Sequence, residues 1–269
     1  MKILHFSDIH AGSWPSTFFA HFDKRLLGGM NYTFRRRKHV KWERLQSLYK
    51  YIEREKPDLV VSTGDFTSIS DPKEFAQARE AIAPLVNSTD FDFVTVPGNH
   101  DFYSHDKRSV KAREDFFSWA NKGRFPLGQY PHLWEHGGVQ FLLLDQSRPN
   151  SMKESSGAFS LETADKAEAL LDSVTEQKVI LLGHYPLAGK FNEAFEKRRS
   201  LDNADILKRW LELGKIDLAF CGHVHTAFRR EESCGSMEIC AGSMTIGGKI
   251  SKVEYDSRTE KFTQSWLDC

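Results

Sequence analysis

Histidine and aspartate residues recur in this sequence at the ends of short apolar runs. The clearest case is CGHVHT, residues 221–226, in which two histidines follow a glycine at the end of the apolar run IDLAF. In an extended backbone, residues i and i+2 point to the same side of a strand. His223 and His225 could therefore converge on one ion if the chain stays extended there. The alternative is a pair of surface histidines on a loop, and ligands elsewhere in the chain decide between the two.

Four other apolar runs end in residues of the same kind. They present Asp8 and His10 in SDIH, Asp65 in TGDF, Asn99, His100 and Asp101 in PGNHD, and His184 in LGHYP. Carboxylate and imidazole ligands without thiolates favour Mn, Fe or Zn in a reactive site over a structural zinc site. A carboxylate such as Asp65 could bridge two ions about 3.5 to 4 Å apart, an arrangement that activates water against a phosphorus centre. With two ions, His223 and His225 are predicted to serve different metals.

The elements that must position these residues alternate along the chain. Strand-length apolar runs are KILHFS, DLVVST, FDFVTV, VQFLLLD, KVILLG and IDLAFCG. Helical periodicity lies between them, over residues 42–55, 72–86, 111–122, 161–174 and 203–214, and the chain after residue 226 is rich in β-type segments. This order predicts an α/β fold of two packed sheets with helices outside. Ligand sites in open α/β sheets lie beyond the carboxyl ends of the strands, where the polar residues are found.

The ordered motifs DIH, GD, GNHD, GH and GHVH resemble those of the calcineurin-like metallophosphoesterases, from residue 8 to residue 225. The resemblance implies a four-layer αββα sandwich of two mixed β-sheets flanked by helices, with residues 1–269 forming a single domain. It also implies two divalent metal ions. Manganese is expected, and iron or zinc remains open.

The resemblance assigns roles to individual residues. Asp8, His10 and His225 would bind the first metal, Asn99, His184 and His223 the second, and Asp65 would bridge them. His100 would be the general acid or phosphate-binding partner beside the leaving oxygen, with Asp101 orienting its ring. Some members of this fold are protein-binding scaffolds that lack a ligand or the motif histidine. All of these residues are present here, which favours a metal-dependent phosphohydrolase over a scaffold.

An insertion, residues 13–42, separates the first motif from the first predicted helix. Its candidate contacts to substrate or membrane are the aromatic residues Phe18, Phe19 and Phe22 and the basic run Arg35, Arg36, Arg37 and Lys38. Bulky aromatics beside clustered cations fit an element that lies among lipid headgroups. A helical insertion that caps the fold, with its aromatics packed inward, fits the same composition. The two interpretations stay open.

The insertion directly follows Asp8 and His10, so a lipid bound there would lie beside the metals. This placement is similar to the calcineurin-like class of UDP-2,3-diacylglucosamine pyrophosphatases, which keeps histidine in GNHD where the better-known class has arginine. The hypothesis is cleavage of that pyrophosphate to lipid X and UMP in lipid A biosynthesis, with peripheral membrane contact. The alternative is a 3',5'-cyclic nucleotide phosphodiesterase or another soluble phosphodiesterase.

The composition restricts the remaining possibilities. The 37 basic and 37 acidic residues balance, so no broad positive field favours nucleic acid as a partner. The N-terminal stretch MKILHFSDIH has no long apolar run behind it, which predicts a cytoplasmic protein. The four cysteines are scattered without a C-x-x-C pair and predict neither a zinc knot nor a disulfide framework. His5, inside the first strand, is predicted to be a core residue.

Overall fold

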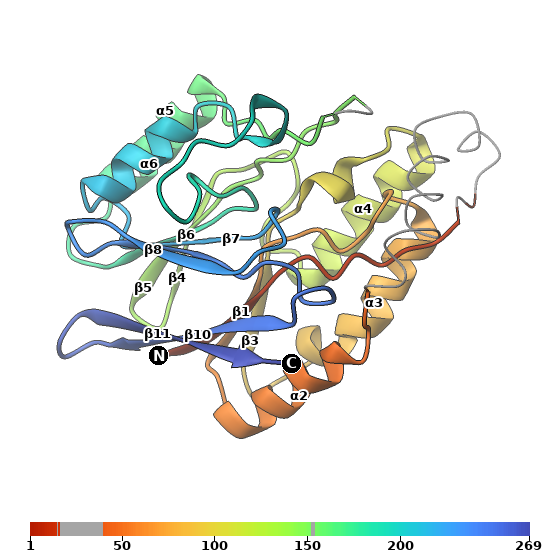
Figure 1. Cartoon of the computed structure of the whole chain (residues 1–269), viewed down its shortest axis with the longest axis horizontal. Helices are drawn as coiled ribbons and strands as arrows, with labels where there is room; N and C mark the ends of the chain where they lie inside the picture. Colours follow the sequence, from red (N-terminus) through yellow and green to blue (C-terminus); the bar gives the residue numbers. More distant parts are fainter. Residues whose placement is uncertain (15, 17–39, 152–153) are drawn as a thin grey trace.

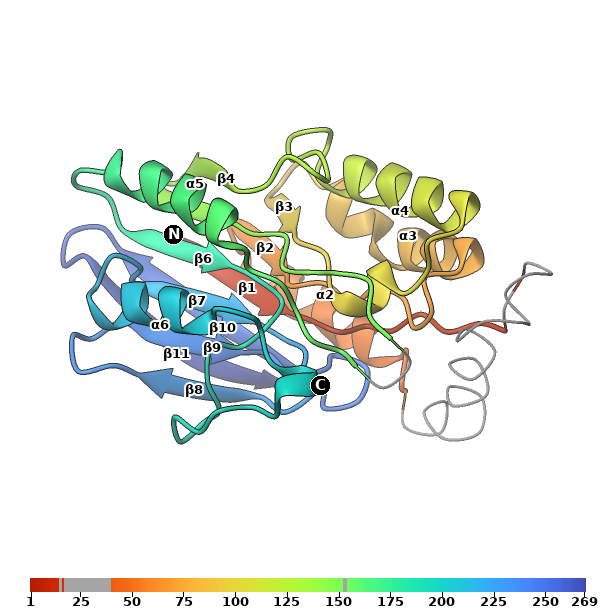
Figure 2. The same cartoon turned by 90° about the horizontal axis from the view of Figure 1, so that it is seen from above.

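The computed structural model describes residues 1–14, 16, 40–151 and 154–269. Two mixed sheets pack face to face, and helices cover the outer face of each (Figure 1, and from above in Figure 2). The predicted α/β fold of two helix-flanked sheets is confirmed. The predicted helical insertion lies mostly within 17–39, outside the described residues.

The first sheet has five strands. Their spatial order is β11 (Lys261–Asp268), β10 (Lys249–Asp256), β1 (Lys2–Phe6), β2 (Leu59–Ser62) and β3 (Asp92–Thr95). Strands β1, β2 and β3 run parallel, and β10 pairs antiparallel with β1. The carboxyl ends of β1, β2 and β3 therefore meet at one edge of the sheet.

The second sheet has six strands. Their spatial order is β4 (His132–His136), β5 (Val139–Leu143), β6 (Val179–Leu182), β7 (Leu218–Cys221), β9 (Met237–Cys240) and β8 (Phe228–Glu231). Strands β5, β6, β7 and β9 are parallel, and antiparallel β4 and β8 form the two edges.

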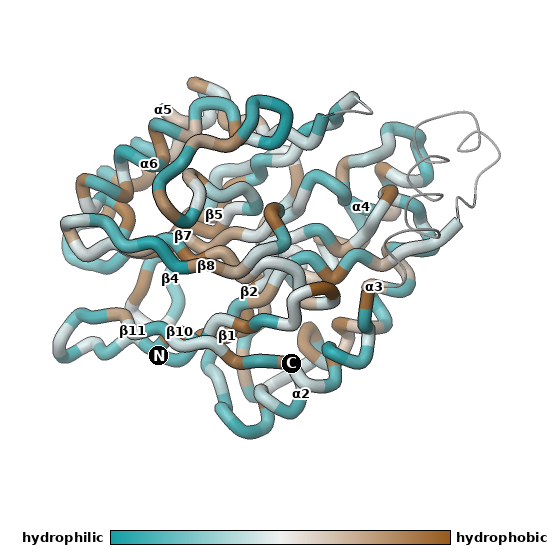
Figure 3. Tube along the Cα trace, viewed as in Figure 1, coloured by the Kyte–Doolittle hydropathy of each residue, from teal (hydrophilic) through white to brown (hydrophobic). Residues whose placement is uncertain are grey.

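Strand alternation divides the apolar side chains between the layers. Ile3 of β1 packs between the sheets with residues such as Phe141 and Ile180, whereas Leu4 faces the helices and packs with residues such as Leu48. Figure 3 shows hydrophobic segments among the strands and hydrophilic ones on the outer turns. His5 is fully buried against Phe220, and its Nε2 lies 3.0 Å from Thr63 Oγ1, which confirms it as a core residue.

Five helices of the described residues flank the sheets. The first sheet is covered by α2 (Arg44–Glu55), α3 (Pro72–Val86) and α4 (Lys107–Ala120), and the second by α5 (Leu161–Asp172) and α6 (Ala204–Glu212) (Figure 1). Two short 3₁₀ turns matter for the site: η3 (Asn99–Phe102) and η4 (Lys197–Arg199). No helix in the described ranges is long and apolar enough to span a bilayer.

The sequence pattern missed two strands, β4 and β8, and placed the start of α4 at residue 111, four residues too late. In β8, FRRE, every second residue is buried, but one of the buried residues is Arg230. Its guanidinium is paired 2.7 Å from the buried carboxylate of Glu238 on β9. A charged residue at an inward position hides the alternation on which the prediction depends.

Candidate metal centre

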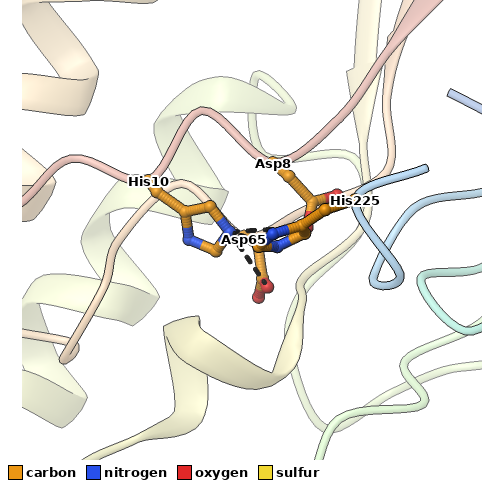
Figure 4. Close-up of side chains that lie close together, drawn as sticks. All are labelled: Asp8, His10, Asp65 and His225. Atoms are coloured by element: carbon orange, nitrogen blue, oxygen red, sulfur yellow. Dashed lines mark hydrogen bonds and ion pairs between the residues drawn. The ribbon is translucent and has the colours of Figure 1, made fainter. Parts of the chain in front are cut away.

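Polar side chains at the carboxyl ends of β1, β2 and β7 point toward one another at a single place (Figure 4). Asp8, His10, Asp65 and His225 each offer one ligand atom, and these four atoms all lie within 4.8 Å of one another. The first three side chains are almost completely buried and His225 is partly exposed. Four residues spread over more than 200 positions of sequence thus form one group that could hold a metal ion.

The spacing within the first donor group (Asp8, His10 and His225) suits a cation. Nε2 of His10 lies 2.8 Å from Nε2 of His225, and Asp8 Oδ1 lies 3.5 Å and 3.2 Å from these two nitrogens. Ligand atoms held about 2.0 to 2.2 Å from one ion come about 3 Å apart from each other. Asp8 Oδ1 is buried, and it accepts no hydrogen bond from the described residues. A buried carboxylate oxygen without a donor is a position that a cation would satisfy.

A second donor group (Asn99, His184 and His223) lies beside the first. Asn99 Oδ1 is 3.2 Å from Nε2 of His184 and 2.9 Å from Nδ1 of His223. Asp65 connects the two groups, because its Oδ2 is 3.4 Å from Nε2 of His184 and 3.9 Å from Nε2 of His10. One carboxylate oxygen therefore faces both groups.

Backbone carbonyls fix the orientation of three of the histidine rings. Nδ1 of His10 donates to the carbonyl of Thr67 at 3.2 Å, and Nδ1 of His184 donates to that of Thr63 at 2.6 Å. Nε2 of His223 donates to the carbonyl of Arg199 at 3.1 Å. Because a carbonyl oxygen only accepts, the proton of each neutral ring is on that nitrogen, and the other nitrogen presents its lone pair to the site. Metal-binding histidines are commonly held in this way.

The charges of the site depend on one another. Burial raises the pKa of the Asp8 carboxyl, but its interactions with the rings of His10 and His225 outweigh burial and hold the pKa well below its usual range. Burial lowers the pKa of His184, yet the charges of Asp65 and Asp8 raise it to about 10. Without a metal, His184 is therefore protonated and supplies positive charge to the buried carboxylates. A bound cation would take over that role and displace the proton.

Left-handed backbone conformations aim these side chains. The φ angle is 56° at Asp8, 47° at His10, 55° at Asp65, 68° at His223 and 58° at His225. Such conformations cost free energy for residues other than glycine and cluster at functional sites. Convergence of His223 and His225 on one ion required an extended backbone. The backbone is not extended there, because both residues have left-handed conformations. Their rings lie in different donor groups, His225 against Asp8 and His223 against Asn99.

Two motif glycines allow the chain segments to approach closely. A Cβ atom on Gly222 would overlap with Ser7 Oγ and with Asp8 Oδ2, and a Cβ atom on Gly98 would overlap with Asp65 Oδ1. Any side chain at these positions would push a carboxylate of the site. The glycines before His223 and Asn99 are therefore part of how the two aspartates are placed.

His100 lies at the border of the site, with its ring centroid 5.0 Å from that of His10. Its Nδ1 donates to the carbonyl of Ser68 at 2.6 Å. The expectation that Asp101 orients this ring is therefore wrong. The buried Asp101 carboxylate accepts the backbone N–H groups of Asp65, Thr67 and Gly98, each at 3.0 Å, because these turn amides all point into the buried space that it occupies. Asp101 acts on the backbone that carries Asp65.

The sequence pattern did not single out Tyr185, which follows His184. Its ring centroid is 4.3 Å from that of His223 and 5.3 Å from that of His184, and its hydroxyl donates to the carbonyl of Ser155 at 2.9 Å. Tyr185 thus packs against both histidines of the second donor group. The apolar context of LGHYP is the signal that could have indicated a packing role.

The proposed lipid contacts Phe18, Phe19, Phe22, Arg35, Arg36, Arg37 and Lys38 lie outside the described residues. The structure describes only the first residues of the insertion and its return from residue 40. Trp14 is 46% exposed, and both the backbone N–H and the hydroxyl of Ser16 bind the Asp71 carboxylate, at 2.8 and 2.6 Å.

Curated proteins share sequence with much of this chain. The chain is 29% identical over 175 residues to a probable glycerophosphodiester phosphodiesterase of Arcobacter nitrofigilis, covering 63% of this chain and 57% of that protein. It is 25% identical over 236 residues to a subunit of the SbcCD nuclease of Staphylococcus epidermidis, covering 85% of this chain and 58% of that protein. The chain therefore spans less than two thirds of the length of these curated relatives.

Solved structures share the fold. A dimetal phosphatase from Danio rerio superposes with a TM-score of 0.67 at 15% identity, covering 100% of this chain and 96% of the other. A putative 5'-nucleotidase from Staphylococcus aureus gives a TM-score of 0.58 at 13% identity, covering 99% of this chain and 54% of the other. The profile of the calcineurin-like phosphoesterases matches residues 1–227, most of the sequence. The chain belongs to the calcineurin-like phosphoesterase family.

Proposed function

We propose that this protein is a dinuclear-metal phosphodiesterase. The observation that carries the proposal is Asp65 Oδ2, which faces Nε2 of His10 in one donor group and Nε2 of His184 in the other. In this proposal Asp8, His10 and His225 would hold one divalent ion, Asn99, His184 and His223 would hold a second, and Asp65 would contribute to both. Bound ions would supply Lewis-acid activation of water and of the phosphoryl oxygens. Manganese is our first candidate, and iron or zinc fits the same donors.

His100 is the residue that we assign to the leaving group. Its Nδ1 proton is committed to the carbonyl of Ser68, so a proton for the leaving oxygen would come from Nε2 of the imidazolium form. The backbone N–H of His100 donates to Asp65 Oδ1 at 2.8 Å, which couples the position of this turn to the carboxylate between the donor groups. The proton donor and the proposed bridging ligand therefore keep a fixed relation to each other.

A soluble phosphodiester is the substrate class that we place first. One curated relative is named as a glycerophosphodiester phosphodiesterase, and cyclic nucleotides belong to the same chemical class. Cleavage of UDP-2,3-diacylglucosamine at the membrane is the second candidate. Its support is the aromatic and basic composition of residues 13–42, with Trp14 exposed at the start of that segment.

The test compares substrates on one preparation loaded with manganese. We expect hydrolysis of bis(p-nitrophenyl) phosphate to exceed that of p-nitrophenyl phosphate, to stop with a chelator and to return with manganese. Cyclic AMP and UDP-2,3-diacylglucosamine assayed side by side then order the two substrate classes. A fully loaded protein that cleaves no diester and no pyrophosphate would refute the proposal.

A further inference from the structure

A short basic turn lies against the second donor group. It is η4 (Lys197–Arg199), and the carbonyl of its last residue accepts the Nε2 proton of His223 at 3.1 Å. Two backbone hydrogen bonds hold the turn, from Ser155 N–H to the carbonyl of Arg198 at 2.8 Å and from Gly157 N–H to that of Ser200 at 3.0 Å. The backbone of Arg199 is therefore fixed beside the site.

The arginines near this turn differ in their partners. Arg198 Nε pairs with Glu196 Oε2 at 2.6 Å, and Arg148 Nη1 pairs with Asp202 Oδ2 at 2.5 Å. The exposed side chain of Arg199 forms no ion pair with any carboxylate of the described ranges. Its backbone carbonyl nevertheless contacts the site, through the 3.1 Å hydrogen bond from Nε2 of His223. Among these three arginines, Arg199 is the one without a carboxylate at ion-pair distance in the described part of the chain.

The position of Arg199 indicates which part of a ligand it would meet. Nδ1 of His223 faces Asn99 at 2.9 Å, and the opposite nitrogen faces the backbone of Arg199. Arg199 is thus separated from the donor atoms by the width of the imidazole ring. A phosphoryl group that reacts at the donor atoms would therefore lie on the inner side of the His223 ring, and only a more distant part of the substrate would meet Arg199.

We infer that Arg199 binds a second phosphate of the substrate, carried on the group attached to the reacting phosphodiester. This inference rests on the proposed phosphodiesterase function and makes it more specific. The planar guanidinium matches a phosphate through two parallel hydrogen bonds, and the exposed position lets substrates of different length reach it. Arg199 is a specificity residue in this account and leaves the chemistry at the reacting phosphorus unchanged.

The kinetic test uses two esters with the same leaving group, thymidine 5'-(p-nitrophenyl phosphate) and its 3'-phosphorylated derivative. They differ only in a phosphate remote from the scissile bond. We expect the manganese enzyme to prefer the 3'-phosphorylated ester in kcat/KM. Arg199→Gln should reduce kcat/KM for that ester by about tenfold or more, mainly through KM, since a charge-assisted hydrogen bond is lost.

Matched variants separate this role from a structural one. Arg199→Gln should leave kcat/KM for the ester without the 3'-phosphate within about twofold of wild type. Arg199→Lys should retain part of the preference for the 3'-phosphorylated ester. Arg198→Gln, on the same turn, should change kcat/KM for neither ester. Equal losses on both esters after Arg199→Gln would overturn the inference, as would no loss on either.

A binding measurement makes the result independent of turnover. Calorimetry on the metal-loaded protein would compare thymidine 3',5'-bisphosphate with thymidine 5'-monophosphate. We expect wild type to bind the bisphosphate more tightly and Arg199→Gln to lose the difference. A wild-type protein that hydrolyses neither ester but shows this difference would refute the phosphodiesterase proposal and keep the phosphate subsite. Equal binding of the two nucleotides by wild type would refute the subsite.

Discussion

Aspartate and histidine residues gather at both ends of the parallel strands, and the two ends differ in how these residues are compensated. At the carboxyl ends, the Asp8 side chain is 0% exposed and Oδ1 has no donor among the described residues. At the amino ends, Asp92 is 36% exposed and lies 3.5 Å from both Arg124 Nη1 and His136 Nδ1. Asp58, just before β2, accepts the backbone N–H of Lys2 at 2.7 Å.

The cavity at the amino ends has a volume of about 710 Å³ and is lined by Asp58, Asp90, Asp92 and His136, among others. Its size and residue types would suit a site, yet the carboxylates of Asp58 and Asp92 are accessible to solvent and already have partners within the protein. At the carboxyl ends, five residues with left-handed backbone aim buried ligand atoms at one another. Convergence of ligand atoms from mostly buried side chains distinguishes the proposed metal centre, and cavity volume does not.

The largest difference in turnover should come from replacing one aspartate at each end of the parallel strands with alanine. Asp65→Ala should lower turnover by about a thousandfold or more and reduce the bound metal below two ions per chain, because one carboxylate faces both donor groups. Asp92→Ala should leave turnover within about twofold, since surface substitutions of compensated residues have small effects. Elemental analysis and steady-state kinetics measure both. Full metal occupancy in Asp65→Ala would contradict the bridging assignment.

A smaller effect is expected for the proton donor. His100→Ala should lower turnover by about 10² to 10⁴ for a diester with an alkoxide leaving group, and less for a p-nitrophenyl ester, which needs little protonation. The metal content should stay that of wild type. His136→Ala at the other end of the strands is the control and should change neither substrate. Equal losses on both leaving groups would favour simple phosphate binding by His100.

The close approach at Gly222 gives a third contrast. Gly222→Ala should weaken metal binding by about 10- to 100-fold, because the added methyl group displaces the Asp8 carboxylate. Gly128→Ala is the control, since its Cβ would meet no atom within 4 Å, although its φ of 82° adds a backbone strain of its own. Metal titration of the two folded variants distinguishes them. Unchanged metal affinity in Gly222→Ala would show that Asp8 is not held by this contact.

The smallest effect concerns the metal-free protein and pH. The folded-state pKa of His184 is raised from 6.5 to about 10, so its contribution to stability is complete below pH 6.5 and is lost as the pH rises through 10. In urea denaturation with a chelator present, the free energy of unfolding should decrease more between pH 6 and pH 9 for wild type than for His184→Asn. His136→Asn should retain the decrease of wild type. An identical pH dependence in wild type and His184→Asn would show that His184 does not contribute to the pH dependence of stability.

The sequence predicted the layered fold because the apolar runs of β1, β2 and β6 are buried on both faces and end in motif glycines or serines. Strand β4 was missed because three of the five residues in HLWEH are polar, they do not alternate with the apolar ones, and most of the strand is half-buried. The ligand types were readable for the same reason as the strands, since each follows an apolar run. The left-handed turns at His223 and His225 could not be predicted, because residue types other than glycine do not indicate a positive φ.

The contacts that support the ligands were also beyond the sequence pattern. The family resemblance implied that Asp101 orients the ring of His100, its neighbour in sequence. The turn places the Asp101 carboxylate under three backbone amides and the His100 ring against the Ser68 carbonyl. Sequence proximity says little about where two adjacent side chains point in a 3₁₀ turn, because successive residues project in different directions.

The most direct test of the account is the position of metal ions in crystals grown with manganese and measured at the manganese absorption edge. The account predicts two anomalous peaks about 3.5 to 4 Å apart on either side of Asp65 Oδ2, one against His10 and the other against His184. A single peak, or peaks among the aspartates at the amino ends of the strands, would contradict it.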